Sequence, residues 1–324
     1  MANPVDEVGL GYWLRWQVPV CALIFVVPAA VALILVIRRI KSEPPTMSSA
    51  DDLWRSCWRN LNPLWLLFYR AFAFLFMAFL LFRVVARSGA FVFYFYTQWT
   101  FALVMIYFAL GTIISAYGCW ICSKKPTSKN KERDELLKRD LQEDRLTNAA
   151  TSKSKADTGN AKLQSYYSQQ EALQKSGYWG YLMRTIYHTC AGASILTDIV
   201  FWCVLVPLLS NKTFKLDLLM GCMHVLNAFF LLLDTSINSL PFSLFGIVYF
   251  VLWSCSYIIF QWTLHACGFT WWPYPFLELS TPWAPLWYFC LALVHIPCYG
   301  IYALLVKAKI SIFPRLFPHA FVKH

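Results

Sequence analysis

Long apolar runs recur along the chain and are separated by shorter polar segments. The first run reads VPVCALIFVVPAAVALILVI, from Val18 to Ile37. An α-helix rises about 1.5 Å per residue, so a run of roughly 20 residues crosses a hydrocarbon layer about 30 Å thick, whereas a helix in a soluble core needs only about half that length. The pattern therefore predicts helices that span a membrane.

Seven runs meet this criterion, and they predict an all-α, polytopic membrane helix bundle with about seven transmembrane helices. Composition agrees, because 58% of the 324 residues are hydrophobic and only 14% are charged, against about 25% charged residues in soluble domains. Little of the chain is left for a soluble catalytic domain. The predicted spans are Val18–Ile37, Pro63–Phe82, Phe91–Trp120, Thr189–Leu209, Leu216–Ser236, Pro241–Leu264 and Leu286–Val306.

One segment, residues 123–176, breaks the apolar pattern with mixed charges, small polar residues and few aromatic ones. Such a segment cannot bury enough apolar surface to fold alone, so we expect a largely disordered linker. Within it, residues 130–145 carry opposite charges at helical spacing and could form a short charged helix. The expected domains are a three-helix membrane segment (1–122), a polar linker (123–187), and a four-helix membrane segment with a short tail (188–324).

The basic residues indicate how the chain is oriented. Of the 28 Lys and Arg residues, 22 lie in the segments after the first, third, fifth and seventh predicted spans, five lie in the opposite segments, and Arg70 lies inside a span. The positive-inside rule then predicts an outside N-terminus with the linker and the C-terminus in the cytosol. Orientation thus accounts for the net charge of +11, and we expect no nucleic-acid partner. The N-glycosylation sequon at Asn211 falls in an outside loop of this topology.

Polar side chains inside the predicted spans are the candidate functional residues, because such groups are costly in a bilayer. Span direction places Thr100, His224 and His295 about 12–14 Å below the outer surface and Asp198 about 16 Å below it. These four side chains can therefore share one layer. The full set is Arg70, Thr100, Asp198, His224, Asp234 and His295.

The fifth predicted span carries a polar stripe. At about 100° per residue, Asn227, Asp234 and Asn238 lie within about 40° of one another. We expect the stripe to face protein rather than lipid. Two interpretations stay open at this point: hydrogen bonds that hold helices together, or part of a binding or catalytic site.

A threonine and a histidine at one depth are the residue types that acyl transfer requires. Thr100 would supply the nucleophilic oxygen and His224 would remove its proton. Asp198 or Asp234 would orient the imidazole as the third member of a triad. We expect neither a cofactor nor a metal ion.

Two stretches carry a family resemblance: YFYTQWTFALVMIYFALGT, from Tyr94 to Thr112, and MHVLNAFFLLLDTSINSLPF, from Met223 to Phe242. They resemble the plant branch of the rolling-stone-like membrane proteins. More distantly, they are similar to the androgen-induced-gene family, which hydrolyses fatty acid esters of hydroxy fatty acids with an intramembrane Thr and His. The resemblance covers roughly Leu64 to Lys307 without the linker. It implies about six spans, so that the first span here is an addition.

The resemblance implies Thr100 as the nucleophile, with Thr97 as a competitor in the same motif. The family's histidine closely precedes a Leu-Pro-Phe-like sequence. In this chain Leu240 begins such a sequence, and His224 lies sixteen positions before it. The chain departs from the family pattern at this point.

Two functions follow as alternatives. The first is an intramembrane lipid-ester hydrolase that uses Thr100 and His224, with membrane lipids around it and a lipid ester as substrate. The second is a non-catalytic heptahelical receptor-like or scaffold protein, with cytosolic partners for the 123–176 linker. A transporter ranks third, since the two halves show no internal repeat. In each case the protein is multi-pass, in the endoplasmic reticulum or plasma membrane.

The charge distribution predicts that a tag within 123–176 is protected from added protease in sealed vesicles whose cytosolic face points inward. Permeabilising the vesicles should expose the tag to cleavage. Cleavage before permeabilisation would reverse the predicted orientation.

Overall fold

The chain folds almost entirely into helices. A computed structural model describes residues 9–42, 53–59, 61–143, 155–209 and 218–322; among them no strand occurs, and only two isolated β-bridges join extended residues. This confirms the all-α fold. The elements are α1 (Leu10–Trp13), α2 (Gln17–Ser42), α3 (Pro63–Ser88), η3 (Gly89–Tyr94), α4 (Tyr96–Glu143), α5 (Lys155–Ile199), η4 (Val200–Leu205), α6 (Val206–Leu209), α7 (Leu218–Ile237), η5 (Leu244–Gly246), α8 (Ile247–Ala266), η6 (Pro275–Leu277) and α9 (Ala284–Leu316).

Six stretches of the described chain are long and apolar enough to cross a membrane, as a polytopic membrane protein requires. A shorter apolar helix, Gly221–Ile237, lies where the fifth span was predicted. A count of seven crossings therefore stays a prediction. The six stretches are Gln17–Ser42, Pro63–Tyr94, Tyr96–Ile121, Gly177–Leu205, Leu244–Ala266 and Ala284–Leu316.

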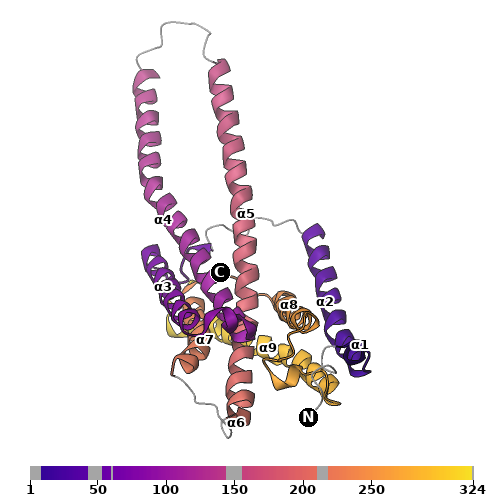
Figure 1. Cartoon of the computed structure of the whole chain (residues 1–324). Coiled ribbons are helices and arrows are strands. Elements are labelled where there is room, and N and C mark those ends of the chain that lie inside the picture. Colours follow the sequence, from indigo (N-terminus) through magenta and orange to yellow (C-terminus); the bar gives the residue numbers. More distant parts are fainter. Residues whose placement is uncertain (1–8, 43–52, 60, 144–154, 210–217, 323–324) are drawn as a thin grey trace.

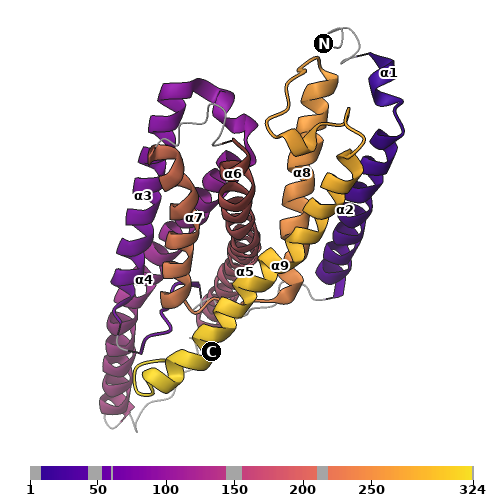
Figure 2. The same cartoon turned by 90° about the horizontal axis from the view of Figure 1, so that it is seen from below.

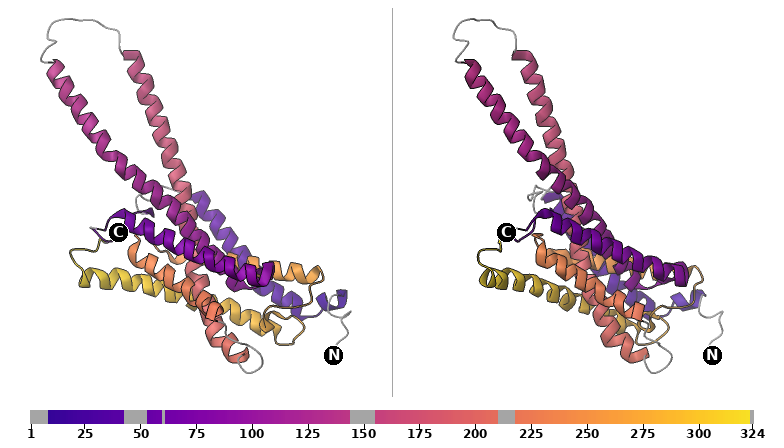
Figure 3. Two further views of the ribbon diagram at one scale, coloured as in Figure 1. Left: turned by 60° about the vertical axis from the view of Figure 1, so that its left-hand side comes forward. Right: turned by 90° about the vertical axis from the view of Figure 1, so that its left-hand side faces the viewer.

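Helix α5 runs through the middle of the bundle. Seen from below, α3, α4 and α7 lie on one side of it and α2 and α8 on the other, while α9 begins beside α8 and crosses to the side of α7 (Figure 2). Helix α1 and the C-terminal end of α9 lie at opposite ends of the bundle (Figure 3).

The polar linker is more helical than its composition indicates. Helix α4 continues to Glu143 and α5 begins at Lys155, so both helices extend well beyond the bundle (Figure 1). Residues 144–154 lie outside the described part, and a largely disordered linker stays a prediction. A helix already nucleated within a span needs only propagation to grow. Acidic residues four positions before basic ones, as at Asp134 and Lys138, favour that growth.

A fully buried ion pair joins α3 to α7. The Arg70 Nε donates to Asp234 Oδ1 at 2.9 Å, and neither side chain is exposed. The Arg70 Nη1 also donates to Ser115 Oγ of α4 and to the Leu53 carbonyl, both at 2.9 Å. Gly111 of α4 makes room for this arginine, because a Cβ there would meet Arg70 Cδ at 3.0 Å.

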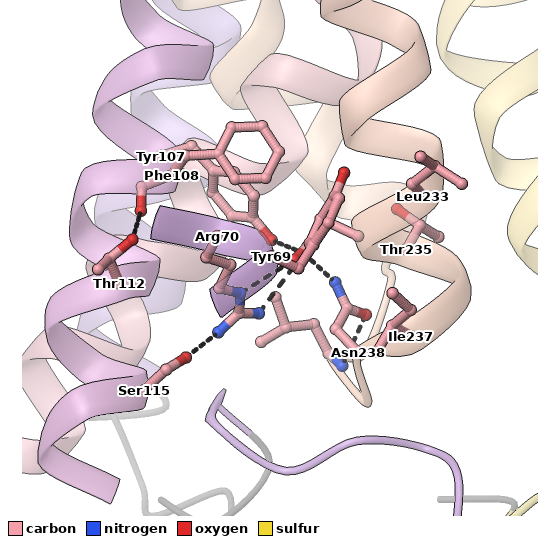
Figure 4. Close-up of polar contacts among 12 residues, drawn as sticks. Tyr69, Arg70, Tyr107, Phe108, Thr112, Ser115, Leu233, Thr235, Ile237 and Asn238 are labelled. Atoms are coloured by element: carbon pink, nitrogen blue, oxygen red, sulfur yellow. Dashed lines mark hydrogen bonds and ion pairs between the residues drawn. The ribbon is translucent and has the colours of Figure 1, made fainter. Parts of the chain in front are cut away.

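Asp234 has two further donors. The Tyr107 hydroxyl of α4 donates to Asp234 Oδ2 at 2.5 Å, and the Asn238 Nδ2 donates to the same oxygen at 2.7 Å. We call Arg70, Tyr107, Ser115, Asp234 and Asn238 the inner layer (Figure 4). Its charges are paired and surrounded by hydrogen bonds, the condition under which a buried ion pair is tolerated.

Thr235, the neighbour of Asp234, connects the two sides of the bundle. Its Oγ1 is hydrogen-bonded to the Tyr187 hydroxyl of α5 at 2.8 Å and to the Tyr302 hydroxyl of α9 at 2.6 Å. The C-terminal end of α7 is thereby tied to helices on both sides of α5.

Removing one partner of the ion pair should destabilise the protein strongly. We expect Asp234→Ala to lower the free energy of unfolding by about 3–5 kcal/mol, because Arg70 would keep an uncompensated buried charge. The double variant Arg70→Met with Asp234→Leu should lose much less, since it removes both charges. Unfolding of the purified protein in detergent measures both effects. An Asp234→Ala protein as stable as the wild type would contradict this role.

Candidate functional site

Helices α4 and α7 run parallel and in constant register. Gln98 Nε2 of α4 lies 3.8 Å from Met223 Sδ of α7, within hydrogen-bonding distance for sulfur. Further along both helices, the Tyr107 hydroxyl contacts Asp234. Sequence numbers rise together along the two helices, so positions that face each other differ by about 125–127.

This register brings Thr100 to the level of Asn227. Thr100 precedes Tyr107 by seven residues, and Asn227 precedes Asp234 by seven. Seven residues fall about 20° short of two full turns and advance a helix by about 10.5 Å. Thr100 and Asn227 therefore lie at the same level of the two helices, closer than Tyr107 and Asp234 to the side predicted to face outside. Both Thr100 and Asn227 are 0% exposed.

Polar atoms at this level lack hydrogen-bond partners within the described protein. They include Thr100 Oγ1, His224 Nδ1 and both amide atoms of Asn227. Leaving a buried polar group unpaired costs about 1–3 kcal/mol, so such groups favour a bound partner. We call the set of residues with such atoms the outer layer: Gln98, Thr100, Asp198, His224 and Asn227.

The imidazole of His224 is held by a ring stack. It lies against the Phe201 ring with a centroid distance of 3.6 Å and an interplanar angle of 13°. Phe201 belongs to the π-helix η4, a local distortion of α5 that in other proteins often coincides with functional sites. The stack fixes the ring plane and leaves Nδ1 available to a ligand.

The polar stripe on α7 faces the protein, as predicted: Asn227, Asp234 and Asn238 are each at most 1% exposed. Asp234 is not available to orient His224, however, because the inner layer holds both of its oxygens. Asp198 has an unpaired Oδ1 and forms no bond to His224 Nδ1. Thr100 and His224 are likewise not hydrogen-bonded to each other.

His295 lines a cavity whose space, counted together with its open side, is about 570 Å³. The cavity lining includes Thr97 but not Thr100, Asp198 or His224. That these three residues and His295 share one layer stays a prediction. Thr197 of α5 and Val200 of η4 line the cavity, whereas Phe201 of η4 stacks on His224. Neighbouring residues of this segment thus contact both the cavity and the outer layer.

Tyr274, from the loop between α8 and α9, forms part of the cavity wall. Burial raises the pKa of its phenol to about 12, so the side chain is neutral at physiological pH. Its oxygen accepts a hydrogen bond from the Tyr96 backbone N–H at 3.1 Å. The loop is thereby fastened to the start of α4.

The sequence did not single out Gln98 of the outer layer or Phe201, which stacks on His224. It did single out Arg70 and Asp234, but not their pairing. Thr100 precedes Tyr107 by seven residues, and Asn227 precedes Asp234 by seven. This shared spacing is a pattern in the sequence that could have indicated that Thr100 and Asn227 lie at one level.

Within the described ranges, no group of three or more His, Cys, Asp or Glu side chains is placed to hold a metal ion. No protein-family model, curated protein or solved structure matches the chain. The chemistry assigned to the outer layer therefore depends on its geometry.

The parallel register can be tested by cross-linking. Native cysteines would be replaced and a protease site placed within residues 144–154. A short bifunctional thiol reagent should then join Thr100→Cys to Asn227→Cys, so that the cleaved halves migrate as one band. Val225 is 49% exposed and points away from α4, so a Thr100→Cys and Val225→Cys pair serves as the control. Equal cross-linking of the two pairs would refute the register.

Proposed function

We propose that this integral membrane protein hydrolyses lipid esters at the outer layer, with Thr100 as nucleophile and His224 as base. The observation that carries the proposal is the unpaired hydroxyl, imidazole nitrogen and carboxamide at one level of α4 and α7. If these groups only held the helices together, they would be hydrogen-bonded to one another, as the residues of the inner layer are. A site that binds an ester would instead leave them available to the substrate.

In the proposed reaction, the imidazole of His224 takes the proton from Thr100 Oγ1 as that oxygen attacks the ester carbonyl carbon. The bond from the carbonyl carbon to the alcohol oxygen then breaks, and the imidazolium returns the proton to the departing alcohol. Water, activated by the same imidazole, cleaves the acyl-threonine ester and releases the fatty acid. Thr100 and His224 are restored.

Asn227 would stabilise the tetrahedral intermediate. Its Nδ2 is an unpaired donor at the level of Thr100, so in this proposal it donates to the developing oxyanion. Asp198 would add a carboxylate next to the η4 segment that carries Phe201.

The substrate class follows from the surroundings and from the family resemblance. Fully buried apolar side chains, among them Phe101 and Val104 of α4 and Met223 of α7, surround the outer layer and suit an acyl chain. Similarity to the rolling-stone-like and androgen-induced-gene families favours fatty acid esters of hydroxy fatty acids. Membership of that group is part of the proposal.

The extension of α4 and α5 beyond the bundle favours a second candidate function. Helix α4 extends to Glu143 and α5 begins at Lys155, so their projecting parts offer a binding surface to cytosolic partners, as in a scaffold protein. This function needs no chemistry at the outer layer. Turnover by the purified protein therefore separates the two candidates.

For the hydrolase, Thr100→Ala and His224→Ala should each reduce turnover of a fatty acid ester of a hydroxy fatty acid by at least about 100-fold, the lower range for loss of a general base. The Thr112 hydroxyl donates to the Phe108 carbonyl of its own helix at 2.7 Å. Thr112→Ala is therefore the matched control and should retain activity. Release of free fatty acid from purified protein in lipid nanodiscs measures the effect.

The same assay tests the competing threonine. Thr97→Ala should keep most of the activity if Thr100 is the nucleophile. Loss of activity in Thr97→Ala with activity retained in Thr100→Ala would move the nucleophile to the cavity. Equal turnover in all variants, or none in the wild type, would favour the scaffold.

A further inference from the structure

The cavity beside His295 is a second candidate site, distinct from the outer layer. It lies where the start of α4, the η4 segment of α5, α8, η6 and α9 meet. The space between its lining residues, counted together with its open side, is about 570 Å³. Much of its wall is aliphatic, from side chains that include Leu196, Val200, Ile258, Leu277 and Leu291.

Hydrogen bonding fixes the role of each nitrogen of His295. Its Nδ1 lies 2.6 Å from the Leu291 carbonyl oxygen, which can only accept, so Nδ1 carries the proton. In the neutral imidazole, Nε2 is then an acceptor. The Nε2 atom is buried and has no partner in the described protein. The His295 ring also packs against Phe250, with a centroid distance of 4.5 Å.

Other hydroxyl groups of the lining already have partners. The Tyr96 hydroxyl is bonded to Ser254 Oγ at 2.8 Å. The Thr197 hydroxyl donates back to its own helix, at 3.0 Å from the Ala193 carbonyl and 2.8 Å from that of Ser194. The wall of the cavity thus combines an extended apolar surface with one unpaired acceptor on His295.

We propose that this cavity binds a single-chain lipid that carries a hydroxyl group. The hydroxyl donates a hydrogen bond to His295 Nε2, and the hydrocarbon chain lies along the aliphatic wall. A carboxylate is excluded as the polar end, because it brings only acceptors and a charge into apolar surroundings. The proposal does not depend on hydrolysis at the outer layer.

The test compares two photoactivatable probes of equal chain length: a diazirine-bearing long-chain alcohol and its methyl ether, which lacks the donor. With purified wild-type protein in nanodiscs, the alcohol should bind about five- to tenfold more tightly than the ether, the effect of one hydrogen bond. Peptide mapping should locate the label on α4, α5 or α9 segments that line the cavity. Equal affinity of the two probes, or label elsewhere, would overturn the proposal.

Variants test the role of each group. His295→Phe should abolish the preference for the alcohol, and His295→Gln, which restores an acceptor, should recover part of it. Val200→Trp should fill the cavity and reduce labelling by both probes. Size-exclusion profiles check that each variant is folded. The comparison of the two probes in wild-type protein tests the proposal even if a variant does not fold. Unchanged labelling in folded Val200→Trp protein would also overturn the proposal.

Discussion

The ion pair between Arg70 and Asp234 is the interaction on which the arrangement of the helices depends. A charge in a bilayer interior must be paired, and an arginine with a rigid set of donors accepts partners only in defined directions. Arg70 therefore fixes the positions of α3, α4 and α7 relative to one another. Lys309 of α9 adds a contact, since its Nζ donates to the Asn238 carbonyl at 2.6 Å. The inner layer is in effect a polar clamp at one end of the bundle.

This clamp explains why the outer layer can remain unpaired. Once Tyr107 and Asp234 set the register of two parallel helices, the positions one heptad earlier lie at one level. Thr100 and Asn227 are then kept at that level by the inner layer rather than by a bond of their own. Unpaired groups that persist because the surroundings hold them are typical of functional sites. The inner layer thus stabilises the bundle, and the outer layer keeps polar groups available for a ligand in apolar surroundings.

The sequence predicts the class of fold well, because span length and hydropathy are local properties. It also predicts that Asn227 and Asp234 share a buried face, since both lie on one helix. Contacts between helices are not local, so neither the Arg70–Asp234 pair nor the separation of His295 from His224 follows from span depth alone. Depth places two residues at one level but does not say which side of α5 they face. Composition alone predicts a disordered linker, whereas growth from an adjoining span favours the helical stretches that end at Glu143 and begin at Lys155.

The proposed hydrolysis requires that Thr100 be an available, activated nucleophile. The most direct measurement is peptide mass spectrometry of the purified protein after rapid mixing with a long-chain activated aryl ester. The account predicts an acyl group on Thr100 in the wild type, formed much more slowly in His224→Ala. An acyl group on Thr97 instead, or no acylated threonine under conditions of turnover, would contradict it.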